Sequence, residues 1–381
     1  MHRRVTITIL TAALVVAAPS VATISRTGGG GAGDGGLAVR AAIAPRQIAY
    51  SNGILYAAQA TAIRRVYESG NVDLLAGTYY RRADGVAPPA LGQPVPALST
   101  PLNGATAVAV DLSDVYAAVG NEVVVIAAGT LRTILAVGTV RSPNGLAVHG
   151  DTLYIADTAN GRVMACPIPT MACVPTVVVA GLTFPMGLAF RGDELLIAEN
   201  APGNRVRSLV GGVLSTIAGG GFGAGDGPAT SVALTQPSAV AVAPDGAVYI
   251  AETGRHRVRK LSAGALTTVA GTGQPNMLNN WVACETTCNA LTVPITSPVG
   301  VAVDDVGRVW IASEADQRLY RLDGGMLTPT GTPTHAATAT TTATATRTPT
   351  LPPTATATAT ATKRRTCVYG TPAPLNEPCD G

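Results

Sequence analysis

The sequence lacks the motifs that mark common catalytic sites and nucleic-acid surfaces. None of the 381 residues belongs to a GxSxG elbow, an HExxH helix or a P-loop, and no nucleophile, base and orienting group form a recognisable set. No stripe of Lys and Arg interleaved with aromatic residues occurs, and the formal net charge is only +3. These absences argue against hydrolytic chemistry and against a nucleic-acid partner.

Long hydrophobic runs are missing beyond the N-terminus. His2, Arg3 and Arg4 precede a mostly apolar run over residues 5–18, and small residues follow at 19–22. This order is typical of a signal peptide, so residues 1–22 are predicted to direct export. No second apolar stretch of about 20 residues follows, as a membrane-spanning helix would need. We therefore expect a secreted or extracytoplasmic, soluble and monomeric protein without an integral membrane segment.

Cysteine is scarce, and all six cysteines follow the predicted signal. They form three local pairs: Cys166 and Cys173, Cys284 and Cys288, and Cys367 and Cys379. An even number in an exported chain favours disulfides. Zinc is a weaker alternative, because the spacings are wider than in CxxC knuckles and no His lies beside them. We predict disulfides within these pairs and no metal or other cofactor.

Glycine and proline, by contrast, are abundant. The 43 Gly and 27 Pro separate short runs of Val, Ile, Ala and Leu, which favours many short strands over helices. One pattern recurs six times: a small residue or Pro, four mostly apolar residues, a polar turn, and then an aromatic residue before Ile-Ala or a similar pair. Its aromatic position is held by Tyr56, Tyr116, Tyr154, Leu196, Tyr249 and Trp310.

Two further predicted strands follow each copy of the pattern, so each unit has four strands. A single unit of this kind cannot bury both of its faces, whereas units arranged in a ring cover one another. Six such units predict an all-β fold, a six-bladed β-propeller.

The fifth copy carries a family resemblance. Residues 225–273 run from Gly-Asp-Gly-Pro-Ala through Ile-Ala-Glu-Thr-Gly-Arg-His-Arg-Val-Arg-Lys to Val-Ala-Gly-Thr-Gly, and this segment resembles a bacterial NHL repeat. The resemblance extends over about residues 23–331 and implies a ring of the NHL type. It weakens in the second copy, where Val119 and Val124 replace the usual acid and arginine. Residues 31–36 copy the linker at 223–227, and in such rings this implies that the first strand helps to close the last blade.

Three copies place an acid after Ile-Ala and an arginine five or six residues later. Across a tight hairpin these side chains would face each other, as cross-strand neighbours do. Because the pair recurs in successive blades, we interpret it as a structural salt bridge rather than as a ring of ligands. The pairs are Asp157 and Arg162, Glu199 and Arg205, and Glu252 and Arg257.

Isolated His and Asp residues offer weaker alternatives. His256 lies in the hairpin of a repeat, and the only other His of the propeller is His149; two histidines without carboxylates in register do not make a zinc site. Asp34, Asp84 and Asp226 lie in glycine-rich linkers, and the DxDxDG spacing of a calcium loop is absent. Turn formation is the simpler role for these aspartates.

Three long connections between blades are candidates for recognition. They cover residues 79–100, 221–236 and 274–297 and should emerge on the face that carries the hairpins between second and third strands. Loops on a rigid scaffold commonly carry binding sites, and aromatic and Arg side chains are enriched in interface cores. Trp281 has an alternative role, which is to pack its own disulfide-closed loop. The predicted contact residues are Tyr79, Tyr80, Arg81, Arg82 and Trp281.

The chain ends in a segment of different composition. Residues 332–366 are almost entirely Thr, Ala and Pro and are predicted to be a disordered linker; residues 367–381 form a short segment bounded by Cys. The leading hypothesis for the propeller, residues 23–331, is a non-catalytic binding or scaffold module for a protein, peptide or glycan. The resemblance also implies an alternative, a propeller lyase or lactonase with a metal at the channel mouth. A purely structural component of the cell envelope is a third hypothesis.

Overall fold

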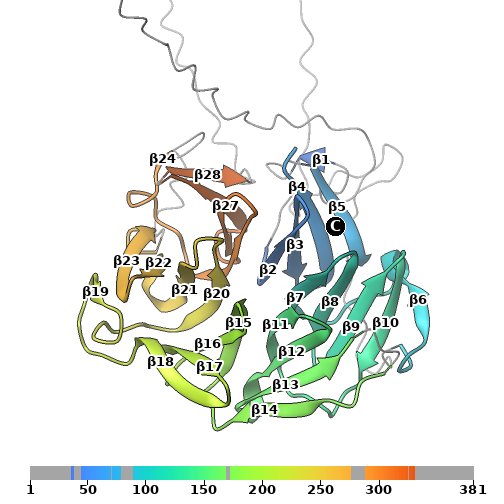
Figure 1. The fold of residues 1–381 in the computed structure, drawn as a ribbon. Helices are drawn as coiled ribbons and strands as arrows, with labels where there is room; N and C mark the ends of the chain where they lie inside the picture. Colours follow the sequence, from blue (N-terminus) through green and yellow to red (C-terminus); the bar gives the residue numbers. More distant parts are fainter. Residues whose placement is uncertain are drawn as a thin grey trace, which may run out of the picture. The chain divides into compact units, whose positions relative to one another are not determined.

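The computed structural model describes residues 36–37, 44–69, 71–78, 89–168, 172–275, 288–324 and 326–330. Within these ranges the chain folds into six antiparallel sheets that radiate from a common centre (Figure 1). This arrangement confirms the predicted all-β, six-bladed propeller. The propeller belongs to a compact unit, Met1–Ala336, and a second unit, Ala337–Gly381, lies outside the described ranges.

Each blade has four main strands, which follow one another in sequence order across the sheet. Blade 1 contains β2 (Ile48–Ser51), β3 (Ile54–Gln59), β4 (Ala62–Tyr67) and β5 (Asn71–Gly77). Blade 2 contains β7 (Ala105–Asp111), β8 (Asp114–Val119), β9 (Glu122–Ala127) and β10 (Thr130–Leu135). Blade 3 contains β11 (Pro143–His149), β12 (Thr152–Asp157), β13 (Arg162–Pro167) and β14 (Thr176–Ala180).

The second half of the ring repeats this order. Blade 4 contains β15 (Pro185–Arg191), β16 (Glu194–Glu199), β17 (Arg205–Val210) and β18 (Val213–Gly219). Blade 5 contains β20 (Pro237–Val242), β21 (Val248–Glu252), β22 (Arg257–Ser262) and β23 (Ala265–Ala270). Blade 6 contains β25 (Pro298–Val303), β26 (Val309–Ser313), β27 (Arg318–Asp323) and β28 (Met326–Thr330). The first strands of neighbouring blades contact one another round the ring, so they form its inner wall.

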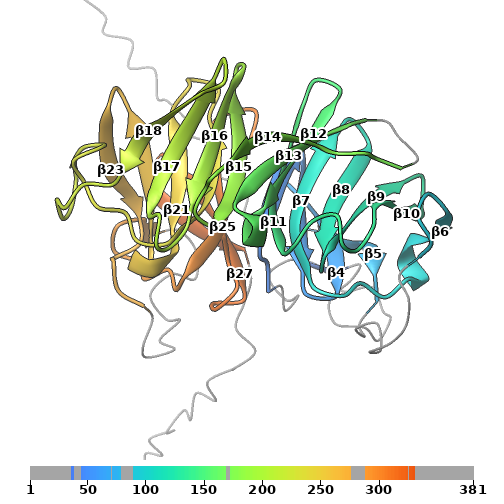
Figure 2. The same cartoon turned by 90° about the horizontal axis from the view of Figure 1, so that it is seen from below.

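Four blades carry a fifth strand on the outer edge, beside the fourth strand (Figure 1), and Figure 2 shows this from below for blade 2. These additions are β1 (Gly36–Leu37), β6 (Pro94–Pro96), β19 (Gly227–Pro228) and β24 (Cys288–Asn289). Short 3-10 helices occupy three of the connections: η1 (Ala97–Ser99), η2 (Thr158–Asn160) and η3 (Thr253–Arg255). In the described part of the chain, no helix is long and apolar enough to cross a bilayer.

The antiparallel order divides the connections between two faces of the ring. The linkers between blades and the hairpins from second to third strand share one face, which we call the linker face. The turns from first to second and from third to fourth strand share the opposite face, which we call the turn face. The Cys166/Cys173 connection joins β13 to β14 and therefore belongs to the turn face.

Burial explains why the second strands read as continuous apolar runs. Every residue of β21 and of β26 is buried, because each blade is covered on both sides by a neighbour and neither face meets solvent. Apolar side chains of adjacent blades enter common clusters; Val258 of blade 5, for example, shares a cluster with Ile311 and Tyr320 of blade 6. No blade therefore has a core of its own.

Glycines in the first strands bring neighbouring blades close together. A Cβ atom on Gly145 would lie 1.7 Å from the carbonyl oxygen of Met186, and one on Gly187 would lie 2.5 Å from the Cα atom of Ala239. Backbone would have to move to admit any side chain at these positions. The first strands of blades 3 to 6 begin with a proline, which we call the strand-one proline. The glycine that recurs two residues after it in blades 3, 4 and 6 is thus required for the close packing of the inner wall.

The expected closure of the ring by the N-terminal strand is wrong. β1 pairs with β5 of blade 1, with Gly36 opposite Val72, and blade 6 is built from its own four strands with β24 at its edge. The reason is that residues 31–36 copy a linker, and the linkers before blades 2, 5 and 6 likewise add their short strand to the blade that follows them.

Side chains instead close the seam between blades 6 and 1. On the linker face, Arg46 Nε lies 2.9 Å from Glu314 Oε1, and Gln47 Nε2 donates to the carbonyl of Val299 at 3.2 Å. On the turn face, Arg308 forms an ion pair with Glu68. A cluster of buried apolar residues from both blades fills the space between these contacts.

The three long connections between blades also stabilise the fold, which the sequence pattern did not predict. After its fifth strand, each returns toward the centre of the ring and buries apolar side chains in the cluster shared by two blades. Leu102 does so between blades 1 and 2, Leu234 between blades 4 and 5, and Ile295 between blades 5 and 6. Only the remaining part of each insertion is available for recognition.

The second blade keeps its hairpin although it lacks the usual acid and arginine. β8 and β9 pair from Val115 and Ile126 to Val119 and Glu122. Val119 and Val124, which replace the acid and the arginine, are buried and supply apolar contacts in place of the ion pair.

Candidate functional site

The recurring acids lie at the ends of second strands and are fully buried. Each faces the arginine that begins the third strand: Arg162 Nε lies 2.7 Å from Asp157 Oδ2, and Arg257 Nε lies 2.7 Å from Glu252 Oε2. Glu199 and Arg205 form the same ion pair in blade 4. The arginine neutralises a carboxylate that could not remain charged alone in this environment.

The second oxygen of each acid holds a linker. It accepts the backbone N–H of the residue two places before the strand-one proline, at 2.7 Å from Arg141, 2.6 Å from Thr183 and 2.9 Å from Thr235. Each acid therefore fastens the linker to the hairpin of the same blade, which accounts for both oxygens without a ligand.

Blade 6 reaches the same result with a different residue. Ser313 stands where the other blades have an acid, and Asp316, three residues later, accepts the backbone N–H of Thr296 at 2.8 Å. The hydroxyl of Tyr320 also donates to Asp316, at 2.9 Å. The acid in the following turn is the sequence signal that could have revealed this substitution.

A second set of bonds joins each blade to the next. Polar side chains of one blade donate to the carbonyl of the proline that begins the first strand of the following blade. The donors and acceptors are Thr106 to Pro143 at 2.6 Å, Thr158 to Pro185 at 2.6 Å, Asn200 to Pro237 at 3.3 Å and Thr253 to Pro298 at 2.6 Å. We call these hydrogen bonds the belt. They join blades 2 to 6 to one another on the linker face, and we describe this face as braced.

The histidines have separate structural contacts. His256 Nδ1 accepts the backbone N–H of Ser297 at 3.0 Å, which bridges blades 5 and 6; Asn204 makes the corresponding bond to Gln236 at 2.8 Å. His149 lies on the turn face, stacked on Phe190 with ring centroids 4.3 Å apart. Among the described residues, no three or more His, Cys, Asp or Glu side chains are grouped so that they could hold a metal ion.

Asp226 fixes its linker to the edge of blade 5. It accepts the backbone N–H of Thr268 at 2.9 Å and lies 3.2 Å from Arg259 Nη2. Arg259 is fully buried and also contacts Glu252, at 3.2 Å. Burial lowers the pKa of Arg259, and the neighbouring Arg257 acts in the same direction. Asp34 and Asp84 lie outside the described residues.

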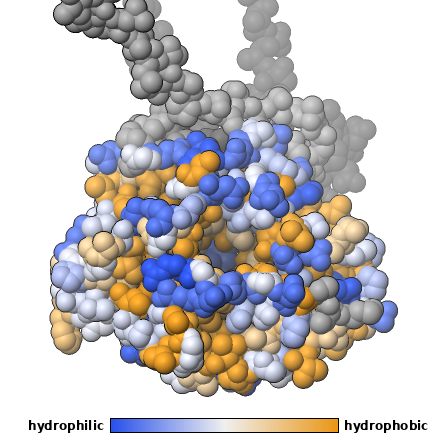
Figure 3. Space-filling view, viewed as in Figure 1, coloured by the Kyte–Doolittle hydropathy of each residue, from blue (hydrophilic) through white to orange (hydrophobic). Residues whose placement is uncertain are grey.

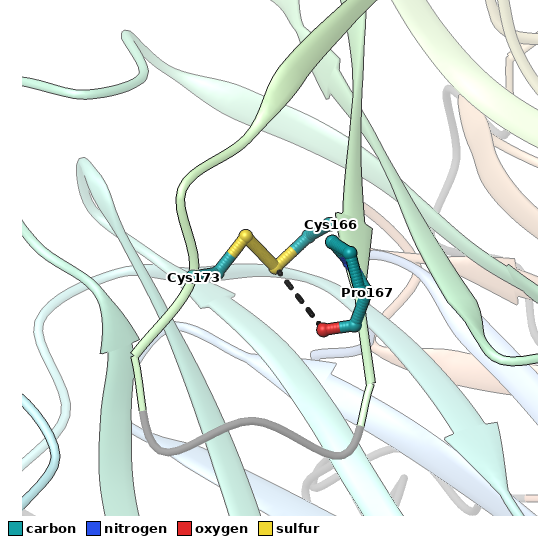
Figure 4. The surroundings of a disulfide bond; sticks show 3 residues. All are labelled: Cys166, Pro167 and Cys173. Atoms are coloured by element: carbon teal, nitrogen blue, oxygen red, sulfur yellow. Dashed lines mark hydrogen bonds between the residues drawn. A yellow bond between two sulfur atoms is a disulfide. The ribbon is translucent and has the colours of Figure 1, made fainter.

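One of the predicted disulfides lies in the described part of the chain. Cys166, in β13, is bonded to Cys173, with the two Cα atoms 5.8 Å apart (Figure 4). The bond closes the connection between the third and fourth strands of blade 3. The side chains of Cys284, Cys288, Cys367 and Cys379 lie outside the described residues.

The predicted contact residues Tyr79, Tyr80, Arg81, Arg82 and Trp281 also lie outside the described residues. The described linkers nevertheless present two exposed aromatic side chains. Phe222, in the linker to blade 5, is 100% exposed, and Phe184, in the linker to blade 4, is 53% exposed. The chain has only three phenylalanines, so most of them lie on the linker face.

Phe222 stands on an ordered loop. The N–H of Gly223 donates to Ser231 at 2.9 Å, and the N–H of Ala233 donates back to Gly223 at 2.8 Å. Gly221 lies so close to Ser231 that a Cβ atom on it would be 2.2 Å from that backbone. A phenylalanine flanked by glycines in a linker was a signal that sequence reasoning missed.

Figure 3 views the ring along its centre and shows hydrophilic residues gathered around a central hollow. A separate cleft, with a volume of about 900 Å³, lies at the turn face between blades 5 and 6. Its lining includes Ala243, Asp245, Tyr249, Lys260, Asp305 and Val306.

Six radial sheets with these repeated contacts define the class of the protein, a six-bladed β-propeller. The NHL repeat matches residues 234–261, which span the first, second and third strands of blade 5. Blade 5 therefore contains an NHL repeat, within a propeller of six blades. Comparison with curated protein sequences found no match.

Solved structures share the fold at low sequence identity. A protein of unknown function from Bacteroides thetaiotaomicron VPI-5482 aligns with a TM-score of 0.57 and 18% identity, over 78% of this chain and 72% of its own. An auxiliary nutrient binding protein of the same organism aligns with a TM-score of 0.54 and 13% identity, over 75% and 69%. A chain of the nidogen/laminin complex aligns with a TM-score of 0.51 and 13% identity, over 71% and 89%.

Proposed function

We propose that the protein is an exported, non-catalytic binding module that recognises a protein, peptide or glycan with its linker face. The observation that carries this proposal is the exposure of Phe184 and Phe222 on successive linkers. Aromatic side chains commonly anchor protein interfaces, because they offer a large contact area at a small cost in conformational entropy.

The braced linker face supports the proposal. Buried acids fasten the linkers to the hairpins, and the belt of bonds to strand-one carbonyls joins blade to blade. A surface held in this way loses little freedom when a partner binds. Binding is also the role named for two propellers of similar fold, the auxiliary nutrient binding protein and the chain in the nidogen/laminin complex; we extend to this chain only the general class of function.

Tyr79, Tyr80, Arg81, Arg82 and Trp281 belong to linkers that leave the same face, and we propose that they add to the contact surface. A deletion that tests this part of the surface should remove only residues within 79–88, since Leu102, later in the same insertion, is buried between blades. Export by the N-terminal residues 1–22 is part of the same proposal, as is a monomeric state.

Affinity capture tests the proposal. The propeller is exposed to envelope and medium fractions of the producing cell as the natural sequence, as the double variant Phe184→Ser/Phe222→Ser, and as Leu112→Ser. Leu112 is a matched control because it is 80% exposed on the turn face. We expect the double variant to lose a captured partner that Leu112→Ser retains. Equal capture by all three proteins would refute the linker face as the binding surface.

A further inference from the structure

Two positions of the repeat hold small side chains at the seam between blades 5 and 6, where the cleft lies. At the seam between blades 3 and 4, the corresponding positions hold His149 and Phe190, whose rings stack on each other. Counted from the strand-one proline, the position of His149 is held in blade 5 by Ala243, and that of Phe190 is held in blade 6 by Val303. Without such a ring pair, this seam has a hollow of about 900 Å³ lined in part by Ala243, a size at which proteins commonly hold ligands.

The walls of this cleft are mostly apolar. Val309 and Leu322 form the buried part, and Val306 and Leu291 stand exposed at the rim. Tyr249 contributes a ring that is almost wholly buried. An apolar chain could lie along these side chains and be removed from water, which favours binding.

The polar groups of the cleft carry an excess of negative charge. Lys260 Nζ lies 3.7 Å from Asp245 Oδ2 and 5.5 Å from the centre of the Tyr249 ring, so its charge is already engaged. Asp305 is exposed at the rim and forms no ion pair or hydrogen bond with any residue in the described ranges. Its neighbour Asp304 is buried and neutralised by Arg308, at 2.5 Å.

The surrounding turn face reinforces this charge. Aspartates lie in or beside the turns between first and second strands in five blades: Asp114, Asp151, Asp193, Asp245 and Asp305. Two of them have a basic neighbour, since Asp193 lies 3.0 Å from His149 and Asp245 lies 3.7 Å from Lys260. Charges of one sign on a common face attract a ligand of the opposite sign before contact. A cation approaching the cleft is therefore favoured over an anion.

We propose that this cleft is a second binding site, which takes the lysine or arginine side chain of an extended partner peptide with apolar residues on either side. The aliphatic stem lies against Val306 and Leu291, and the cationic head pairs with Asp305. This site lies on the opposite face from the phenylalanines of the linkers, so the two surfaces can be tested separately.

A synthetic peptide provides the probe: acetyl-Ala-Leu-Lys-Leu-Ala-amide, titrated into the full chain by calorimetry. Its companions carry Nε-acetyl-lysine or Glu in place of Lys. Asp305→Asn removes the free carboxylate, Ala243→Leu fills the cleft, and Asp151→Asn removes an exposed aspartate of another blade as the matched control. Because Asp305 and Asp151 are exposed, these two variants should fold.

We expect saturable binding of the lysine peptide that is about three- to tenfold weaker with Asp305→Asn, as for loss of one partly exposed ion pair. Acetylation of the peptide should weaken binding to a similar degree, and Ala243→Leu should abolish it. Asp151→Asn should weaken binding by less than about twofold, because this aspartate of blade 3 acts only at long range, where salt screens its charge. Absence of saturation at millimolar peptide would overturn the proposal. Equal affinity of the acetylated peptide, or stronger binding of the Glu peptide through Lys260, would do so as well. Phe184→Ser/Phe222→Ser should not alter this titration, so failure here is distinct from failure of the linker-face proposal.

Discussion

Glu252 stands at the centre of the most heavily charged contact in the ring, which makes Glu252→Gln an informative perturbation. Its Oε2 atom accepts from Arg257 at 2.7 Å and from Arg259 at 3.2 Å, while Oε1 accepts from the N–H of Thr235. Glutamine can keep the bond to Thr235, but it removes the buried one of the two carboxylates that balance the fully buried Arg259 and leaves only the half-exposed Asp226. Breaking a buried pair by removal of one partner costs about 3–5 kcal/mol.

Asp157→Asn is the matched comparison in blade 3. Asp157 has the same position and the same bond to a linker N–H, but its partner Arg162 is 29% exposed and can be hydrated when the charge is lost. We expect a loss of about 1.5–3 kcal/mol, the usual size for a hydrogen bond to a charged group. Glu252→Gln should therefore be the more damaging change, by about 1–2 kcal/mol.

Urea unfolding followed by circular dichroism measures both losses. The double variant Glu252→Gln/Arg259→Met adds a control, since it also removes the buried cation that has lost its buried partner and should recover at least about 1 kcal/mol relative to Glu252→Gln alone. Equal losses for Glu252→Gln and Asp157→Asn, or no recovery in the double variant, would refute the idea that burial of Arg259 decides the energetics of this contact.

Three further predictions follow from contacts and charges. His256→Asn should leave the free energy of unfolding nearly unchanged, because Asn204 makes the corresponding bond in blade 4, whereas His256→Ala should cost about 1 kcal/mol; equal effects would contradict the proposed capping role. Burial, followed by Asp114 and Asp111, raises the pKa of Tyr116 from 10.0 to about 12, so the stability that its neutral phenol contributes is present below pH 10 and is lost as pH rises toward 12. Tyr116→Phe should therefore reduce the fall of the thermal midpoint between pH 10 and pH 12, and an unchanged fall would argue against this cause. Dialysis against EDTA should leave the thermal midpoint and partner capture unchanged, while stoichiometric zinc or calcium whose removal abolishes an activity would favour the lyase alternative.

The repeated features of the fold could be predicted because they are local. Six copies of one strand pattern specify six blades, and Glu199 and Arg205 face each other because a tight hairpin brings positions six residues apart together. The Cys166–Cys173 disulfide follows from the same short separation. In each case the distance along the chain limits the distance in space.

Contacts between blades could not be predicted from the sequence pattern. Thr158 reaches the carbonyl of Pro185 only because the ring places successive first strands side by side. The edge position of β1 likewise depends on which blade its linker precedes. The cleft was also hidden, since Ala243 and Val303 look ordinary in a strand until the stacked His149 and Phe190 of another seam reveal what their positions could hold.

Hydrogen exchange of the propeller, with and without its captured partner, tests the linker-face proposal most directly. We expect slower exchange in the linkers around Phe184 and Phe222, with little change in the turns between first and second strands away from the cleft between blades 5 and 6. Protection confined to the turn face, with both linkers exchanging as in the free protein, would contradict it.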